Sequence, residues 1–317
     1  MDWLIKTFGY TMREAWCIEQ MVRVLGQVGK RGLIATFTII AQLCSFCTSG
    51  TPITPFGDEL DLTGYSLVFE DEFDGDSLNW DVWRTRGEGS KTYFKLSKDQ
   101  VSVHDGNLYI TAQYKDANTG KYGAGWYTGD IKLRKQYTYG YFEVRAICNN
   151  DAAFNSAFWL QSDHCYDSKY SLGGPGGAEI DILENLMYYY GYSAAKNTIH
   201  VAGIDGPDDT GTDTYHMPPF WTENDMFSEY NTYGVMWTED EYIFYHNGVE
   251  TVRTSFANGV CEVPCSVILS FAGPNTSKSW QVAGFNKLAK NRTPTFTIDY
   301  VRIYQLDKDT AEAIANK

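Results

Sequence analysis

Three carboxylates crowd into six residues of one apolar segment and are the first candidates for chemistry. Within GGPGGAEIDILENLMYYYG they are Glu179, Asp181 and Glu184. Like charges held this close disfavour joint ionisation, so one glutamate should keep its proton at neutral pH while another stays charged. Asp181 between them could hydrogen-bond one carboxylate, orient it and tune its acidity. The pattern therefore indicates paired acid and base chemistry.

A β-strand explains how the three acids could share one face. Glu179 and Asp181 point to one side of a strand and the intervening isoleucines to the other, as a period of two requires. Glu184 then falls on the wrong parity, so we predict a β-bulge at Ile182 or Leu183 that returns it to the acidic face. The outer Cα atoms would be about 13 Å apart, and inward-leaning side chains could approach the 5 to 5.5 Å, roughly, of a retaining glycosidase.

Two other structures would leave the acids without a catalytic role. Ile180, Leu183 and Met187 match a helical stripe, but the Gly-rich entry and the tyrosines at 188–190 favour a strand. A structural calcium site has oxygen ligands available, yet the run lacks the spacing of a calcium loop. We therefore expect a strand that carries catalytic groups.

The elements that must position these acids are short strands separated by turn signals. HNGV carries a hairpin signal at Asn247 and Gly248, and helical periodicity is convincing only before residue 30 and at Asp309 to Asn316. Many short strands predict an all-β fold, a jelly-roll sandwich of two antiparallel sheets, without internal repeat or second domain. The runs are YSLVFEDEF, HDGNLYITAQY, YGYFEVRAI, YGVMWTEDEYIFYHNGVETVR, PCSVILSFA and TFTIDYVRIYQ.

The first 50 residues differ from the remainder. Lys30 and Arg31 precede the apolar run GLIATFTIIAQLCSFC, which is followed by small polar residues in the order of a secretory signal. We expect a signal peptide, with a signal anchor or an amphipathic helix as alternatives and Met21 as a second candidate start. Residues 51–62 are expected to be a linker, 63–306 the catalytic domain and 307–317 a C-terminal tail. The protein would then be secreted, periplasmic or held at the cell surface.

Charge and cysteine content restrict the partners. Acidic residues outnumber basic ones 40 to 26, for a net charge of -14, so nucleic acid is excluded as a partner, and so is a membrane beyond an N-terminal anchor. We expect a monomer. Beyond residue 50 the four cysteines, an even number, permit two disulfides without demanding them, and a zinc site is disfavoured by their spacing. They are Cys148, Cys165, Cys261 and Cys265.

The motif ExDxxE, read as Glu179, Asp181 and Glu184, resembles that of glycoside hydrolase family 16. Six landmarks over most of residues 65 to 305 fall in the family's order: LVFEDEFDG, VSVHDGNLYITA, YGYFEVRA, SAFWLQ, TYGVMWT and FTIDYVRIYQ. The resemblance implies a concave substrate cleft and retaining hydrolysis of internal β-linkages in a polysaccharide. It implies that Glu179 is the nucleophile, Asp181 its helper and Glu184 the general acid and base.

Aromatic residues near these landmarks are candidates for sugar binding. The resemblance implies that Trp159 is part of a sugar platform, since the apolar face of a pyranose stacks on indole, with a core tryptophan as the alternative. Trp126 and His200 are further substrate-binding candidates, whereas His164 and His216 are expected to be solvated. No cofactor is required. A structural calcium near the chain ends, as in some members, could use Glu70 and Asp299.

The departures from the family pattern concern the substrate. Residues 155–159 read NSAFW, where members that cut β-1,3-glucans usually have WPAFW, and SAFWLQ is more similar to the branch that cuts algal galactans. The substrate is therefore a β-1,3- or mixed β-1,3/1,4-glucan or an algal β-galactan. A non-catalytic lectin and a transglycosylase are the alternatives. Only scattered basic contacts are expected for a sulfated chain, from Lys91, Lys95, Arg134 and Lys135.

Overall fold

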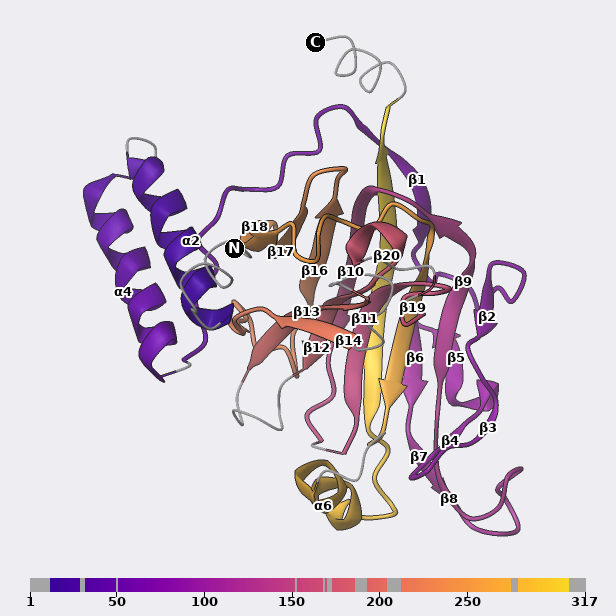
Figure 1. Cartoon of the computed structure of the whole chain (residues 1–317). Helices are drawn as coiled ribbons and strands as arrows, with labels where there is room; N and C mark the ends of the chain where they lie inside the picture. Colours follow the sequence, from indigo (N-terminus) through magenta and orange to yellow (C-terminus); the bar gives the residue numbers. More distant parts are fainter. Residues whose placement is uncertain are drawn as a thin grey trace.

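The structure is a computed structural model in which two large antiparallel sheets lie face to face, with helices at the edges (Figure 1). It describes residues 12–28, 32–49, 51–151, 153–167, 169, 173–185, 193–203, 212–274 and 279–307. The predicted all-β sandwich is confirmed.

The first sheet carries the acid triplet, and we call it the site sheet. Its strand order is β14-β13-β12-β11-β19-β9-β2, and the short β15 pairs with β13. In chain order the strands are β2 (Trp83–Thr85), β9 (Asp130–Tyr137), β11 (Asn155–Ser162), β12 (Glu179–Asn185), β13 (Ala194–Ala202), β14 (Thr212–His216), β15 (Phe220–Trp221) and β19 (Cys265–Ala272).

The second sheet has the order β18-β17-β16-β10-β20-β6-β5, and β1 pairs with β20. Its strands are β1 (Tyr65–Asp71), β5 (Val101–His104), β6 (Asn107–Thr111), β10 (Gly140–Ile147), β16 (Asn231–Trp237), β17 (Tyr242–His246), β18 (Val249–Thr254) and β20 (Thr295–Leu306). A small third sheet joins β3 (Gly89–Ser90), β4 (Lys95–Leu96), β8 (Gly125–Thr128) and β7 (Gln113–Lys115). Short 3-10 turns are η1 (Lys98–Gln100) and η2 (Gly174–Gly176).

The core lies between the two large sheets and follows the period-two pattern of the strands. On β10 the side chains of Phe142 and Val144 are buried in it, and on β19 those of Val267 and Leu269. The predicted turn at residues 247–248 joins β17 to β18, and both residues have positive φ, as a tight hairpin requires. Burial of one face of each strand leaves the other face of the site sheet for chemistry.

The described part of the N-terminal region contains the helices α2 (Met12–Gly26) and α4 (Leu33–Ser49), which pack on each other beside the sandwich (Figure 1). Arg23 of α2 forms an ion pair with Glu250 of β18, so this helix contacts the sandwich. None of the described helices combines the length and apolarity needed to cross a membrane. The signal peptide remains a prediction.

The remaining segments follow the sequence expectations in part. Residues 51–62 lie along the sandwich, where Ile53 bridges to Phe220 and Glu59 to Val249. A helix that the sequence did not predict, α6, spans Ser279–Lys287. The predicted helix at 309–316 lies outside the described residues. The four cysteines beyond residue 50 are free thiols, and the Sγ atoms of Cys261 and Cys265 are 3.7 Å apart.

Candidate active site

The glycine-rich segment before β12 lets the chain pass close to a neighbouring loop. A Cβ atom on Gly174 would lie 2.0 Å from the carbonyl oxygen of Gly259, so this approach requires glycine. Gly177 has a φ of 146°, and a Cβ there would lie 2.4 Å from the hydroxyl of Ser162. The segment held by these close contacts leads directly into β12, which begins at Glu179.

The predicted β-bulge is present in β12. Trp159 of β11 pairs with Asp181 and Phe158 pairs with Leu183, so Ile182 has no partner of its own. Pairing with β13 shifts over the same residues, and Glu184 lies opposite Lys196. Because of the bulge, all three acids lie on the outer face of the site sheet while the residues between them are buried.

Glu179 is a largely buried carboxylate with several polar neighbours. Its Oε2 atom accepts a hydrogen bond of 2.6 Å from the amide nitrogen of Gln161, and it is also hydrogen-bonded to the hydroxyl of Tyr166. Burial, followed by the negative charge of Asp181, raises the pKa of Glu179 from 4.5 to about 7. Glu179 therefore changes its protonation state near neutral pH.

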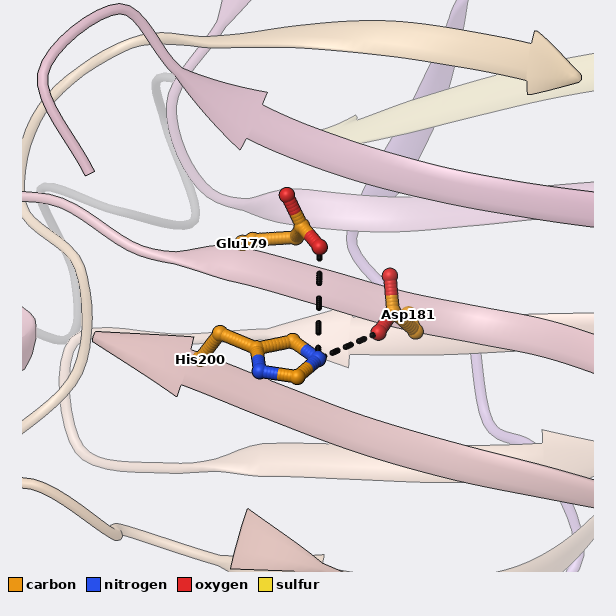
Figure 2. A group of neighbouring side chains, drawn as sticks. All are labelled: Glu179, Asp181 and His200. Atoms are coloured by element: carbon orange, nitrogen blue, oxygen red, sulfur yellow. Dashed lines mark ion pairs between the residues drawn. The ribbon is translucent and has the colours of Figure 1, made fainter. Parts of the chain in front are cut away.

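Asp181 and His200 form a close pair beside Glu179 (Figure 2). The Nε2 atom of His200 lies 3.2 Å from Asp181 Oδ2 and 3.9 Å from Glu179 Oε1, and its Nδ1 is 2.8 Å from the hydroxyl of Thr214. Burial and the charge of Glu184 raise the pKa of Asp181 well above its usual range, and burial lowers that of His200. Both shifts disfavour the charged forms of the two groups, so burial weakens the ion pair between Asp181 and His200.

Glu184, the third acid, has a different set of partners. It accepts hydrogen bonds from the amide of Asn155 at 3.2 Å and from the hydroxyl of Thr198 at 3.3 Å. Its carboxylate is half-buried, and Lys196 stands opposite it on β13. The two glutamates thus sit at opposite ends of the triplet with separate hydrogen-bond partners, as two different chemical roles would require.

Trp159 lies on the same face as the acids, next to Asp181. Its indole nitrogen donates to the hydroxyl of Ser270 at 3.1 Å, and its ring is covered by the guanidinium of Arg86 at 4.4 Å from the ring centroid. Arg86 in turn donates to Gln161 at 2.9 Å and to Asp130 at 3.4 Å. Trp159 is 8% exposed, so little of its surface is available to a ligand.

A group of cations continues this face toward the β2 edge. The register from Asp181 runs through Trp159 and Ile268 to Lys132 of β9 and Arg84 of β2, and directly paired residues share a face. Burial and the positive charge of Arg84 lower the pKa of Lys132. These cations therefore lie close enough together to repel one another.

Several of the other predicted residues lie elsewhere. Trp126 is not brought to the acids, because its indole is 5% exposed and packs against Tyr114, Phe154 and Phe285. His200 is brought to them, but as a partner of Asp181. Asp299 forms an ion pair with Arg145. Three of the four basic residues suggested for a sulfated chain have other contacts: Lys95 with the carbonyl of Ala124, Arg134 with those of Trp80 and Trp83, and Lys135 with the Tyr137 ring.

The sequence reasoning missed Gln161, Asn155, Arg86 and Tyr166. Period two from Trp159 places Gln161 and Asn155 on its own face, so the strand pattern could have found both. Arg86 and Tyr166 lie on loops that approach the site, so no local sequence pattern predicts their position there.

Metal binding has one candidate group in the described part of the chain. One ligand atom each of Glu179, Asp181 and His200 lie within 4.8 Å of one another. Two of these residues belong to the ExDxxE motif, and His200 is the partner of Asp181. Neither Glu70 nor Asp299 belongs to it, and calcium binding stays a prediction.

A protein-family model matches most of this chain. The model described as "Beta-porphyranase A-D, GH16 domain" matches residues 67–306. The chain belongs to glycoside hydrolase family 16. The ExDxxE motif of this family member coincides with the three acids that the bulge brings to one face.

Curated relatives of this family 16 chain include two polysaccharide-cleaving enzymes. It is 25% identical over 290 residues to the glucan endo-1,3-beta-glucosidase A1 of Niallia circulans, covering 81% of this chain and 39% of the relative. It is 26% identical to the endo-1,3-1,4-beta-glycanase ExsH of Rhizobium meliloti, covering 79% of this chain and 54% of the relative. The chain thus spans about half or less of these relatives' length.

Solved structures share the fold of this family 16 chain. The kappa-carrageenase of Zobellia galactanivorans superposes with a TM-score of 0.61 at 21% identity, covering 77% of this chain and 96% of the other. The laminarinase catalytic domain of Thermotoga maritima has a TM-score of 0.58 at 21% identity, covering 76% and 98%. This likeness shows the jelly-roll fold.

Proposed function

We propose that this protein is a retaining endo-β-glycosidase that hydrolyses internal linkages of an anionic algal β-galactan such as porphyran. The observation that carries the reaction type is the bulge in β12, which places Glu179, Asp181 and Glu184 on one face. Sugar binding alone does not require such a triplet, whereas two-step hydrolysis requires two carboxyl groups with different roles.

The reaction assigns one role to each glutamate. In the first step the Glu179 carboxylate attacks the anomeric carbon, while protonated Glu184 gives its proton to the departing glycosidic oxygen. In the second step Glu184 takes a proton from water, and the resulting nucleophile displaces Glu179 from the sugar. Asp181 lies beside the nucleophile, and its charge raises the pKa of Glu179.

The choice of a galactan rests on the cations of the site face. Arg84 and Lys132 lie on this face in a protein whose net charge is -14. A sulfate ester on the substrate would complement them, because paired charges on a partly buried face offset each other's desolvation. The porphyranase-type family model supports the same class.

A panel digest tests both the reaction and the substrate. Porphyran, agarose, carrageenan, laminarin and mixed-linkage glucan are incubated with the protein, and product masses are read over time. We expect porphyran to give long early fragments, and NMR of fresh products to show the β-anomer first. An α-anomer would contradict retention, and uncut, tightly bound porphyran would indicate a lectin. Products longer than the substrate, formed on an added acceptor oligosaccharide, would indicate a transglycosylase.

A matched pair of charge variants tests the anionic substrate. Lys132→Gln should raise KM for porphyran by about tenfold and leave KM for agarose nearly unchanged, because it removes one contact to an anion. Lys135→Gln, on the same strand but stacked on Tyr137, changes the net charge equally and should affect neither. Equal effects of both variants would argue against a specific anion contact.

A β-glucan is the second candidate substrate, because both curated relatives are named as β-glucan or β-glycan enzymes. Efficient cleavage of laminarin without cleavage of porphyran would select it.

A further inference from the structure

Gln161 is the nearest polar neighbour of the proposed nucleophile on the adjoining strand. It lies directly opposite Glu179 in the pairing of β11 with β12, and its amide nitrogen donates to Glu179 Oε2 at 2.6 Å. A hydrogen bond of this length to a carboxylate restricts where the carboxylate can point. The orientation of Glu179 therefore depends on the orientation of this amide.

Arg86 determines which end of the amide faces Glu179. Its Nη2 atom donates to the oxygen of Gln161 at 2.9 Å, and an arginine can only donate. The amide oxygen is thus directed to Arg86 and the nitrogen to Glu179. A glutamine without this partner could turn over and present its oxygen to the carboxylate, which would repel it.

Arg86 is itself held from three sides. Its guanidinium contacts Asp130 Oδ2 at 3.4 Å and covers the Trp159 ring at 4.4 Å, and its backbone nitrogen donates to the Asp130 carbonyl at 2.9 Å. Asp130 is buried on β9, two strands away from Gln161. The contacts form a continuous chain from β9 to the nucleophile.

We propose that Arg86 and Gln161 are positioning residues that act as a relay: Arg86 fixes the amide of Gln161, and Gln161 fixes the carboxylate of Glu179 for attack. The proposal rests on the proposed function, in which Glu179 is the nucleophile. Neither residue needs to touch the reacting atoms. The charge of Arg86 also acts directly on Glu179, and the other titratable groups near it are Asp181 of β12, His200 of β13, and Cys165 and Tyr166 after β11.

A measurement that needs no substrate tests the relay. With ¹³C at glutamate side-chain carboxyls, the Glu179 resonance is identified by its absence in Glu179→Gln and followed against pH. Gln161→Leu should move its titration midpoint upward by about one pH unit, because a donor to the ionised form is lost. Gln161→Glu should move the midpoint upward at least as far, since it donates nothing to Glu179 and adds a second negative charge beside it.

The matched control is Gln136→Leu. Gln136 lies on the same sheet, where its amide donates to the hydroxyl of Ser266 at 3.3 Å. This variant should leave the Glu179 titration unchanged. An unchanged titration in Gln161→Leu as well would overturn the relay.

Kinetics on porphyran separate positioning from substrate binding. Gln161→Leu should lower kcat by roughly 10- to 100-fold, the range of a lost hydrogen bond to a charged group, with KM within about twofold. The acid limb of the pH–rate profile of this variant should move to higher pH, together with the titration midpoint of Glu179. Arg86→Met keeps the stem over Trp159 and should lower kcat less than Gln161→Leu does. Measured at a pH above the acid limb, the double variant should lose no more kcat than Gln161→Leu alone, although its titration midpoint should lie higher, because the Arg86 charge that lowers the Glu179 pKa is also lost. Additive losses of kcat would contradict a relay.

The two proposals fail in different ways. If the wild-type protein cuts no polysaccharide but its Glu179 titration responds to Gln161→Leu, the proposed function is contradicted and the relay is supported. If the enzyme is active but neither its Glu179 titration nor the acid limb of its pH–rate profile changes in Gln161→Leu, only the relay is contradicted.

Discussion

Two buried glutamates on opposite sheets have their pKa values shifted in opposite directions. Burial and the charge of Asp181 raise the pKa of Glu179 to about 7. Glu250 of β18 is fully buried, but hydrogen bonds and charge from Arg253, together with the charge of Arg23, outweigh that burial and hold its pKa below the usual range. The Arg253 Nε atom donates to Glu250 at 3.0 Å.

The difference shows what distinguishes a structural carboxylate from a catalytic one. Glu250 is matched by permanent cations, so its charge is stabilised and serves the attachment of α2 and the β17–β18 hairpin. Glu179 has a second carboxyl and a neutral histidine as neighbours, which leaves its charge only partly compensated. Such uncompensated groups on an outer face are typical of functional sites.

The largest effect should come from the site glutamates. Glu179→Gln and Glu184→Gln are each expected to lower kcat by about 10⁴-fold or more, because each removes a group used in bond making or breaking. Circular dichroism should show the fold retained. Near wild-type turnover in either variant would refute the role assigned to that residue, and Glu250→Gln is the control that should keep its turnover per folded molecule.

Glu250→Gln should instead destabilise the protein. Loss of one partner from a buried ion pair costs about 3 to 5 kcal/mol of unfolding free energy, which chemical denaturation can measure. Glu72→Gln is the matched control, since the Glu72–Arg302 pair is about one-third exposed on both sides and should contribute less than about 1 kcal/mol. Equal losses in the two variants would remove the distinction between the pairs.

Glu179→Gln should stabilise the protein above neutral pH. The folded pKa of Glu179 is raised, so between pH 4.5 and about 7 the folded state binds more protons than the unfolded state and stability falls as pH rises. The variant should be more stable than wild type by about 3 kcal/mol at pH 8, with no difference near pH 4. Glu250, whose pKa is lowered, should give the opposite trend. A difference in stability between Glu179→Gln and wild type that does not change with pH would show that the charge of Glu179 is not a source of instability.

The smallest effect concerns the position of the pH profile. Wild-type kcat/KM should fall as pH drops below about 7, because the nucleophile must be ionised. Asp181→Asn removes the neighbouring negative charge, so its acid limb should lie lower by up to about one pH unit. An acid limb that stays in place would show that Asp181 does not act on Glu179 through charge.

The fold followed closely from local patterns. Alternating residues on the strands and the turn at Asn247 and Gly248 predicted the sandwich, because burial of one sheet face imposes a period of two. The helix Ser279–Lys287 was missed, since its sequence SWQVAGFNK shows only a weak apolar stripe. Trp126 was placed with the sugar because an aromatic residue looks the same in a core as on a binding face.

The sequence alone determined that three acids would share one face, because the parity of a strand admits Glu184 to that face only through a bulge. The tertiary structure decided which groups surround them. Arg86 reaches Gln161 across 75 positions of the chain, and His200 reaches Asp181 only by strand pairing. The protonation and orientation of the three acids depend on such neighbours within a few ångströms. The spacing of residues along the chain does not determine which of them come this close in space.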